Sequence, residues 1–304
     1  MTRTSRRSRV LLAVGAAALA LSSCGIVGNP SNAFSVDGVA YSRSDLNTLV
    51  KSLAAMDQLI VVNEVAQSKD LLGILEVVIQ YRAAERLLEL RGTPVTEAER
   101  KAIRDQAAPQ MPQSMPARIV DLLVDISATG QALDKIAVPT TDELKKMYEG
   151  HPASTGMLCA REITVRTQEE ARDVVDQLAG GARFEDLARK VSVAKTAKET
   201  GGAVLTGTGE PCMTVPQAGA GTKLGGTLTR ALLSTEVGAN TGVVQDAKGW
   251  HVAVHRPFAE VSTSLAGQLK DKPGRTLADG MLATADIQVN PVYGTWNPVS
   301  AKVE

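Results

Sequence analysis

Aromatic side chains are scarce in this chain of 304 residues: phenylalanine, tyrosine and tryptophan together make up 3% of it. A hydrophobic core must therefore be built from leucine, valine, isoleucine and alanine, and stacking platforms for bases or sugar rings are not expected. The chain also lacks an excess of one charge, because 33 lysines and arginines balance 33 aspartates and glutamates. This balance excludes the broad basic field typical of nucleic-acid binding, so we expect no nucleic acid among the partners.

Metal ligands are also few. The chain has three histidines and three cysteines, and it contains neither a C-x-x-C nor an H-E-x-x-H sequence. We therefore expect no metal site and no cofactor. The glycines between Gly201 and Gly226 do not have the spacing of a phosphate loop, and Ser192 has no recognisable histidine and aspartate partners. The common signatures of nucleotide binding and of serine hydrolases are thus excluded.

The long apolar run of the chain stands near the N-terminus, after four arginines and no acidic residue. Residues 10–21 have the length of the apolar part of a secretory signal peptide, and a membrane-spanning helix needs about 20 residues. The following Leu21-Ser22-Ser23-Cys24 resembles the lipobox of bacterial lipoproteins. This resemblance implies cleavage before Cys24, acylation of its thiol and attachment to the extracytoplasmic face of the cell membrane. The alternative is an ordinary secretory peptide that a cysteine follows by chance.

About 280 residues remain after such a cleavage, which is enough for one large or two medium domains. No other segment is apolar enough to span a bilayer, so we expect the rest of the chain to be soluble. Cys159 and Cys212 then remain as a pair in an oxidising compartment, where a disulfide persists. The alternative is two separate buried thiols.

The first half of the chain has the periodicity of helices. Residues 33–41 alternate apolar and polar side chains around Asp37-Gly38, which predicts a strand or a tight hairpin. Ser42 or Ser44 is a suitable cap for the first helix, and Gly92 is a suitable end for the second. We expect helices at residues 45–56, 70–91, 96–106, 117–133 and 141–150.

Strand-like and helical segments alternate after Pro152. The pattern predicts strands at residues 158–165, 201–205, 249–254 and 286–291, and helices at residues 168–178, 184–190 and 227–234. A further helix is expected at residues 265–285, where Pro273-Gly274 splits or kinks it. Residues 207–226 have almost no periodicity.

The segment from Cys159 to Arg256 reads β-α-α-β-α-β and resembles a parvulin-type (PpiC-type) peptidyl-prolyl isomerase domain. Five short strings in the family's order carry this resemblance. They are Ala160-Arg161-Glu162-Ile163-Thr164-Val165, then Gly180-Gly181-Ala182 with Phe184-Glu185-Asp186-Leu187-Ala188, then Ser192, Gly201-Gly202 and Gly249-Trp250-His251-Val252. The alternative is a chance α+β sequence.

The resemblance implies a catalytic site, but the chain departs from the family's pattern there. Parvulins have two facing histidines; the second is kept as His251, whereas Glu162 stands at the position of the first. Ala194 stands where the family has cysteine or aspartate, and Asp246 stands where it has threonine or serine. The resemblance thus leaves Glu162 and His251 as the candidate catalytic residues.

Candidate substrate contacts follow from the same resemblance. Ser192 matches the family's serine after the second helix, and Met213 is the candidate for the methionine of the proline pocket. The pocket's phenylalanine has no clear counterpart near Val215-Pro216. Much of the apolar surface that binds proline in parvulins is therefore missing.

The flanking segments resemble the SurA and PrsA type of extracytoplasmic foldase lipoprotein. The closing Val289-Asn290-Pro291-Val292-Tyr293-Gly294-Thr295-Trp296 is similar to the ending of such chains. The resemblance implies an α+β fold, in which a helical SurA-like N-terminal domain is completed by the C-terminal helix and strand. A parvulin-like β-α-α-β-α-β domain is inserted in it, and a strand at residues 34–36 pairs with residues 286–290.

This organisation implies a signal peptide at residues 1–23 and a tether at residues 24–33. The helical chaperone domain is expected at residues 34–153, completed by 258–298, and the parvulin-like domain at residues 154–257. Helices with one apolar face in a loosely packed arm would offer a groove to unfolded chains. The alternative is that these faces are simply core.

Three hypotheses for function remain. The first is a membrane-tethered chaperone or foldase for newly exported, unfolded polypeptides, whose isomerase activity is weak or lost. In support, an inward Glu162 beside His251 would form an ion pair that keeps the imidazole charged and would not replace the neutral histidine pair. The second is an active prolyl isomerase that uses Glu162 and His251. The third is a non-enzymatic envelope lipoprotein that docks one folded partner.

Overall fold

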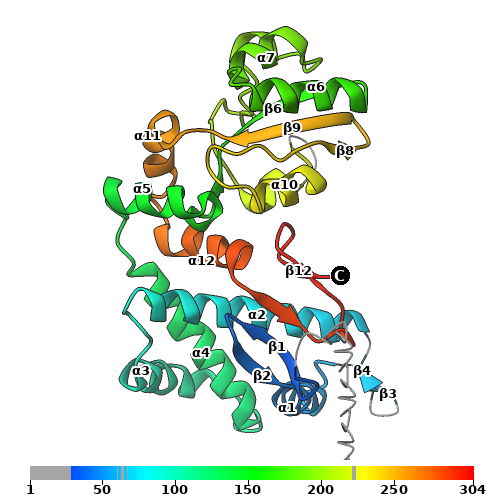
Figure 1. Cartoon of the computed structure of the whole chain (residues 1–304). Helices are drawn as coiled ribbons and strands as arrows, with labels where there is room; N and C mark the ends of the chain where they lie inside the picture. Colours follow the sequence, from blue (N-terminus) through cyan, green and yellow to red (C-terminus); the bar gives the residue numbers. More distant parts are fainter. Residues whose placement is uncertain (1–28, 60, 63–64, 67, 221–223) are drawn as a thin grey trace, which may run out of the picture.

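The computed structural model describes residues 29–59, 61–62, 65–66, 68–220 and 224–304, so Cys24 and the expected signal peptide lie outside the described residues. Two units are stacked in the described part (Figure 1). A helical unit contains both ends of the described chain, and a sheet unit is inserted between its helices α5 (Thr141–Gly150) and α11 (Phe258–Gln268). None of the helices described combines the length and apolarity that a membrane crossing requires.

The first strands of the helical unit form a tight hairpin, as Asp37-Gly38 predicts. β1 (Asn32–Val36) pairs with β2 (Val39–Ser42), and the turn residues have φ of 46° and 79°, the left-handed region that such turns need. β10 (Ile287–Val289) pairs antiparallel with the other edge of β1, with Phe34 opposite Val289. The predicted return of the C-terminal segment to the first strand is therefore confirmed.

Side-chain caps set the starts of several helices in this unit. The Ser42 side chain accepts a hydrogen bond from the Asp45 backbone, and Thr96 and Thr140 form capping boxes. Besides α5 and α11, its helices are α1 (Arg43–Ala54), α2 (Ser68–Leu90), α3 (Glu97–Ala107), α4 (Ala117–Asp134) and α12 (Pro273–Thr284). Its short elements are β3 (Val61–Val62), β4 (Val65–Ala66), η1 (Ala108–Gln110), η2 (Pro152–Thr155), β11 (Trp296–Asn297) and β12 (Lys302–Val303). Most side chains in its core are aliphatic, as the scarcity of aromatic residues predicts.

The segment expected as one helix at residues 265–285 is two helices. α11 begins at Phe258 rather than at Leu265, because Pro257 has a φ of −58° that suits a helix start and because Phe258 and Val261 are buried in the core. Helix α11 ends at Gln268, with Leu269 as its C-cap. Pro273 then begins α12 at a position where no backbone N–H is needed. The predicted split at Pro273-Gly274 is thus correct, and the predicted start is wrong.

Helix α12 packs directly against backbone, without side chains between. A Cβ atom on Gly280 would lie 2.5 Å from the Ser154 carbonyl oxygen and 2.7 Å from the Gly156 nitrogen, both next to or within η2. A Cβ atom on Gly274 would likewise overlap the Leu133 carbonyl near the end of α4. These glycines let α12 join the helical unit to the segment that leads into the sheet unit.

The sheet unit has a small antiparallel sheet covered on both faces. Its strands are β6 (Ala160–Val165), β9 (Gly249–His255) and β8 (Val244–Asp246), hydrogen-bonded in that order, with β5 (Met157–Leu158) and β7 (Met213–Thr214) as a separate pair. Its helices are α6 (Gln168–Ala179), α7 (Phe184–Val191), α8 (Ala197–Thr200), α9 (Val215–Gly219) and α10 (Gly226–Leu233). Helices α6 and α7 cover one face of the sheet and α10 covers the other (Figure 1).

One expectation for this unit is wrong. Residues 201–205 do not form a strand but contribute only an isolated bridge between Ala203 and Arg161, because Gly201 and Gly202 have φ of 60° and 79°. The stretch without periodicity contains the short β7, which pairs with β5, and the short α9, which begins with a capping box at Thr214.

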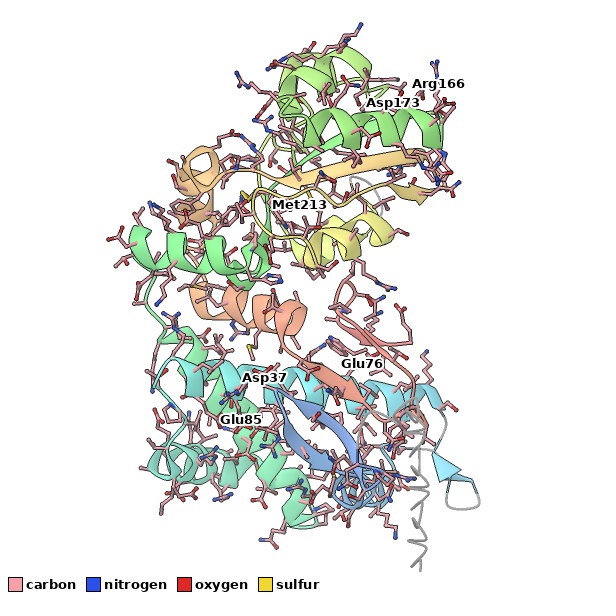
Figure 2. The ribbon with its side chains drawn as sticks, viewed as in Figure 1. Asp37, Glu76, Glu85, Arg166, Asp173 and Met213 are labelled. Carbon is pink, nitrogen blue, oxygen red and sulfur yellow. A yellow bond between two sulfur atoms is a disulfide. The ribbon has the colours of Figure 1, made fainter. Side chains whose placement is uncertain are left out.

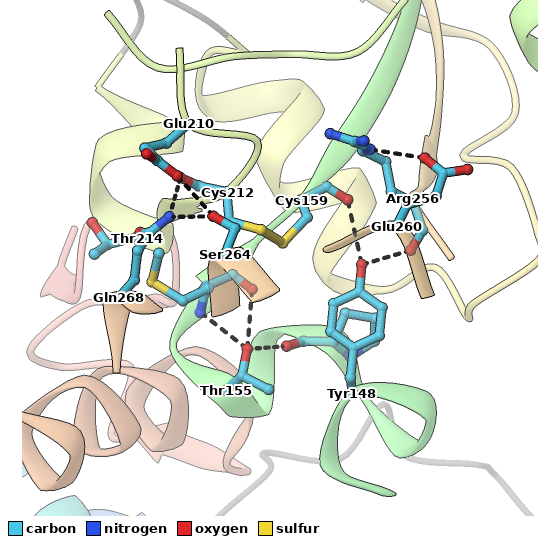
Figure 3. The surroundings of a disulfide bond; sticks show 12 residues. Tyr148, Thr155, Cys159, Glu210, Cys212, Thr214, Arg256, Glu260, Ser264 and Gln268 are labelled. Carbon is cyan, nitrogen blue, oxygen red and sulfur yellow. Dashed lines mark hydrogen bonds and ion pairs between the residues drawn. A yellow bond between two sulfur atoms is a disulfide. The ribbon is translucent and has the colours of Figure 1, made fainter. Parts of the chain in front are cut away.

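The chain enters and leaves the sheet unit at one junction, shown in Figure 3. The Tyr148 hydroxyl on α5 donates a hydrogen bond to the Arg256 carbonyl at 2.7 Å, and the Arg256 N–H donates to the Cys159 carbonyl at 2.9 Å. Cys159 and Cys212 form a disulfide with Cα atoms 4.2 Å apart, which confirms the predicted pairing. Because the disulfide closes a loop of 53 residues, the chain-entropy model assigns it a stabilisation of about 4 kcal/mol.

We predict opposite effects for alanine at two helical glycines. Gly280→Ala should lower the free energy of unfolding by about 1–3 kcal/mol, because the new methyl group overlaps backbone atoms of residues 154–156. Gly73→Ala on α2, where no atom lies within 4 Å of the new Cβ, should raise it by about 0.5–1 kcal/mol. Urea denaturation of both variants checks this, and a neutral Gly280→Ala would contradict the close packing of α12.

Candidate functional site

The candidate catalytic residues lie on the face of the sheet that α10 covers. Side chains alternate along a strand, so Ile163 of β6 and Val252 of β9 point toward α6 and α7. Glu162 and His251 consequently point to the opposite face. The antiparallel register places Thr164 opposite His251 and Glu162 opposite Ala253, so Glu162 and His251 are diagonal neighbours.

His251 lies between two carboxylates. Its Nδ1 is 2.6 Å from Glu162 Oε1, and its Nε2 is 2.8 Å from Asp246 Oδ1 on β8. Carboxylate oxygens only accept hydrogen bonds, so both ring nitrogens donate when the imidazole is positively charged. We name Glu162, His251 and Asp246 the carboxylate–histidine triad. The His251 side chain is 1% exposed, so neither ring nitrogen is left for a substrate.

Neighbouring groups hold the two carboxylates in place. The Thr164 hydroxyl donates a hydrogen bond to Glu162 Oε1 at 3.0 Å, and the Lys248 backbone N–H donates to Asp246 Oδ1 at 2.6 Å. Both carboxylates are mostly buried, with side chains 15% and 16% exposed. A connected polar network of this kind is rigid, because each member restricts the orientation of the next.

The triad shifts the pKa values of His251 and Asp246. Burial alone would lower the pKa of His251, but the hydrogen bonds to Glu162 and Asp246 raise it above its ordinary value. Burial would raise the pKa of Asp246, but the Lys248 N–H and the His251 ring lower it below the usual range. Because the pKa of His251 is higher in the folded state, its stabilising contribution is present below about pH 6.5 and is lost as pH rises through the folded value.

A cleft of about 350 Å³ opens beside the triad. It is lined by residues 162, 194, 196–197, 202–207 and 209. Among these described lining residues Glu162 is the charged one, and the others are small, aliphatic or hydroxyl side chains. The volume lies within the range of small-molecule sites, so the cleft is large enough for one ring-sized apolar group with adjoining backbone.

Gly202 shapes the floor of this cleft. Its φ is 79°, and a Cβ atom there would lie 2.7 Å from the Glu162 carbonyl oxygen. Its own carbonyl accepts a hydrogen bond from the Glu162 N–H at 2.8 Å. Glycine is therefore required here, because the backbone of residue 202 lies directly against that of residue 162.

The two candidate substrate contacts have other partners. The Ser192 hydroxyl oxygen accepts hydrogen bonds from the backbone N–H groups of Thr164, at 3.1 Å, and Ala194, at 3.3 Å, and thereby fixes the end of α7 to β6. Met213 is 3% exposed and packs in the core between α10 and the sheet (Figure 2). Neither is among the residues that line the cleft, whereas Glu162 and Ala194 are. The role of Ser192 and Met213 in substrate binding stays a prediction.

The structure adds two features to the site that the sequence reasoning missed. Asp246 was noted as a replacement for the family's threonine, but not as a second partner of His251. The hairpin of β8 and β9 carried a signal for it: Val244 lies opposite His251, so Asp246 two residues later shares the same face. The other feature is the cleft wall at residues 205–209, which has no periodic pattern.

The remaining histidines bind the carboxyl end of α10. Nε2 of His255 lies 2.9 Å from the Leu232 carbonyl oxygen, and Nε2 of His151 lies 2.9 Å from that of Leu233. Burial lowers the pKa of His255, so its stabilising contribution is present above about pH 6.5 and is lost as pH falls toward the folded value. In the part of the chain described, no group of three or more histidine, cysteine, aspartate or glutamate side chains is arranged to hold a metal ion.

Comparison with known proteins places the sheet unit in a family. Residues 159–255 match the Rotamase family, described as the PPIC-type PPIASE domain. The foldase protein PrsA of Caldanaerobacter subterraneus subsp. tengcongensis is 27% identical over 161 residues, which are 50% of this chain and 49% of that protein. The match thus spans about half the length of this relative. The predicted resemblance of the segment to PpiC-type isomerases is confirmed.

Two solved structures are similar to the chain over most of its length. The crystal structure of PrsA from Bacillus subtilis has a TM-score of 0.29 and 16% identity, and the similarity covers 85% of this chain and 94% of that one. A structure described as one of two SurA-like chaperones of Campylobacter jejuni has a TM-score of 0.26 and 20% identity, with coverage of 80% and 92%.

Histidine titration by NMR provides a direct check of the triad. We expect His251 to titrate above pH 6.5 and His255 below it, because carboxylates surround the first ring and burial dominates at the second. Glu162→Gln should lower the pKa of His251, since one opposite charge is removed. The control Glu169→Gln changes an exposed carboxylate in the first turn of α6 and should leave it unchanged. A wild-type His251 that titrates below pH 6.5 would contradict the triad.

Proposed function

Because the chain contains a PpiC-type isomerase domain and is homologous to the foldase PrsA, we propose that it is a chaperone or foldase for unfolded, newly exported polypeptides. Its isomerase activity is weak or lost. The observation that carries the second part of the proposal is the carboxylate–histidine triad. The first part is supported by a groove in the helical unit that has exposed aliphatic residues next to it in the chain.

The triad leaves His251 without a free group for catalysis. Rotation about an X-Pro bond has a barrier of about 18–20 kcal/mol, and a site lowers it by binding the proline ring and by hydrogen bonds to the twisted amide. Both nitrogens of His251 are already hydrogen-bonded to carboxylates, and its side chain is 1% exposed. Each tenfold acceleration requires about 1.4 kcal/mol of transition-state stabilisation. The loss of two or three contacts to the proline ring or the twisted amide therefore removes most of a modest rate enhancement.

A groove of mixed polar and apolar lining, with exposed aliphatic residues next to it in the chain, supports binding of unfolded chains. A cavity of about 710 Å³, which we name the helical groove, is lined by residues 91–94, 96, 99, 132 and 135–137 at the ends of α2 and α4 and the start of α3. Leu90 and Val138, which adjoin these residues in the chain, are 59% and 42% exposed. Exposed aliphatic side chains beside a cavity favour binding of apolar segments of another polypeptide.

We also propose that the protein is held to the extracytoplasmic face of the cell membrane by a lipid on Cys24. The support is the lipobox-like Leu21-Ser22-Ser23-Cys24 after a basic and an apolar segment. Two acyl chains would make the attachment stable. A tether of this kind raises the local concentration of a weak binder near emerging unfolded chains.

A second candidate function is an active isomerase in which Glu162 acts electrostatically. Glu162 lines the cleft, and its Oε1 alone is used for the bonds to His251 and Thr164. A planar amide carries partial negative charge on its oxygen and loses part of it on twisting. A carboxylate near that oxygen would therefore favour the twisted state over the planar one.

An isomerisation assay separates these two functions. We expect the cis/trans isomerisation rate of a proline tetrapeptide in the presence of the wild-type chain to stay within about twofold of the uncatalysed rate. The uncatalysed isomerisation takes tens to hundreds of seconds. An acceleration that disappears in Glu162→Gln, but not in the control Glu169→Gln, would instead establish the second function.

Aggregation assays with several unrelated unfolded proteins test the helical groove. We expect Leu90→Glu combined with Val138→Glu to weaken the suppression of aggregation by about tenfold, because each charge opposes binding of an apolar segment. The control Val292→Glu changes a residue that is 70% exposed on the C-terminal segment and should have no effect. If the wild-type chain suppresses no aggregation, the chaperone function is wrong, and docking of a single folded partner becomes the better explanation.

The lipid anchor is tested by mass spectrometry of the protein extracted from membranes with detergent. The expected mature chain begins at Cys24 and carries acyl groups on that residue. Cys24→Ser should abolish the acylation and release the chain from the membrane fraction or leave it unprocessed. A wild-type mature chain that begins elsewhere, or that carries no lipid, would contradict the anchor.

A further inference from the structure

The wall of the cleft is a short loop that both begins and ends beside β6. At its start, the Val204 N–H donates a hydrogen bond to the Ala160 carbonyl at 3.0 Å. At its end, Cys212 is bonded to Cys159 through the disulfide. Residues 205–211, which we name the cleft loop, are therefore attached at both ends to neighbouring residues, Ala160 at the start of β6 and Cys159 just before it.

The cleft loop is held together by hydrogen bonds within it. The Thr206 N–H donates to the Glu210 carbonyl at 2.9 Å, and the Glu210 N–H donates to the Thr206 hydroxyl oxygen at 2.9 Å. The Gly209 N–H donates to the Thr206 carbonyl at 3.1 Å, with Gly209 at a φ of 88°. Because Thr206, Gly207 and Gly209 line the cleft, the position of this turn sets the width of the cleft.

An element from outside the sheet unit holds this turn in place. The Ser264 hydroxyl on α11 donates a hydrogen bond to Glu210 Oε2 at 2.9 Å. The Gln268 side-chain amide donates to the Cys212 carbonyl and to Ser264 Oγ, both at 3.1 Å (Figure 3). The adjacent side of α11 belongs to the helical unit, since Leu265 is fully buried in its core. The helix thus contacts the cleft loop with one side and the helical core with the side next to it.

We propose that Ser264 and Gln268 are positioning residues for the cleft, through which the helical unit controls the binding of peptide in the sheet unit. The proposal rests on the proposed function, a foldase that binds polypeptides, and takes the cleft of its isomerase domain as the place where X-Pro segments bind. A cleft loop held by α11 is preorganised, and peptide binding then requires little further ordering of its wall. A shift of α11 moves or releases the loop, because the contacts between them are side-chain hydrogen bonds.

The test uses the full chain and measures the cleft loop independently of any ligand. Ser264→Ala should change the NMR amide shifts of Gly207 and Gly209 and speed hydrogen exchange at Gly209. A labelled Ala-Ala-Pro-Ala peptide should bind about fivefold more weakly, as expected for loss of one hydrogen bond that preorganises the loop. The free energy of unfolding should hardly change, because the Ser264–Glu210 bond is exposed.

Matched variants separate positioning from a general effect. Ser300→Ala removes a similar exposed bond, from a serine hydroxyl to Glu304 Oε1 at 3.2 Å, and should alter neither the amide shifts nor the binding. Glu210→Gln keeps an oxygen that accepts from Ser264 and should behave as wild type, whereas Glu210→Ala should behave as Ser264→Ala.

Two results have distinct meanings. Unchanged Gly207 and Gly209 shifts in both Ser264→Ala and Gln268→Ala overturn the control of the cleft loop by α11. A wild-type chain that does not bind the peptide overturns the proposed use of the cleft, while the amide shifts still decide whether α11 positions the loop.

Discussion

The structure depends on bringing together the two ends of an inserted unit. A sheet unit placed between α5 and α11 leaves the helical unit intact only if its first and last residues are adjacent. The antiparallel pairing of β6 with β9 achieves this, because Ala160 lies opposite His255. Tyr148 then donates a hydrogen bond to the Arg256 carbonyl, and the disulfide joins Cys159 to Cys212 at the end of the cleft loop. Since one junction carries all these contacts, the same few residues hold the stacked units together and support the cleft.

The same alternation of side chains that builds the sheet also assembles the carboxylate–histidine triad. Residues that point to α10 meet in the interior of the unit, where a histidine between two carboxylates satisfies both of its nitrogens. His251 stands at the position of a parvulin histidine, but both of its ring nitrogens bind carboxylates within the protein. The cleft beside it stays open, with Glu162 belonging to both. Under the proposed function, binding of polypeptide and acceleration of isomerisation would therefore be separable properties of this site.

Local signals in the sequence predicted much of the fold and part of the site. The Asp37-Gly38 turn, the Ser42 cap and the return of β10 to β1 follow from short-range chemistry or from the family's order of elements, and the structure has them. The meeting of Glu162 with His251 follows from strand alternation once the two strands are paired. Pro257 is also a local signal for the start of α11, although the pattern predicts a later start. The path of the cleft loop could not be predicted in this way, because it is set by contacts with residues far away in the chain, such as Ser264 for Glu210.

The pairing of β1 with β10 also constrains the order in which the chain can fold. Phe34 and its partner Val289 are 255 residues apart along the chain. Because a chain emerges from its N-terminus, residues 32–42 become available for pairing long before the strand that covers the open edge of β1. A folded sheet unit, whose β6 and β9 both precede β10, shortens the flexible path between the two partners. Closure of the helical unit then costs less entropy than the distance along the chain would suggest.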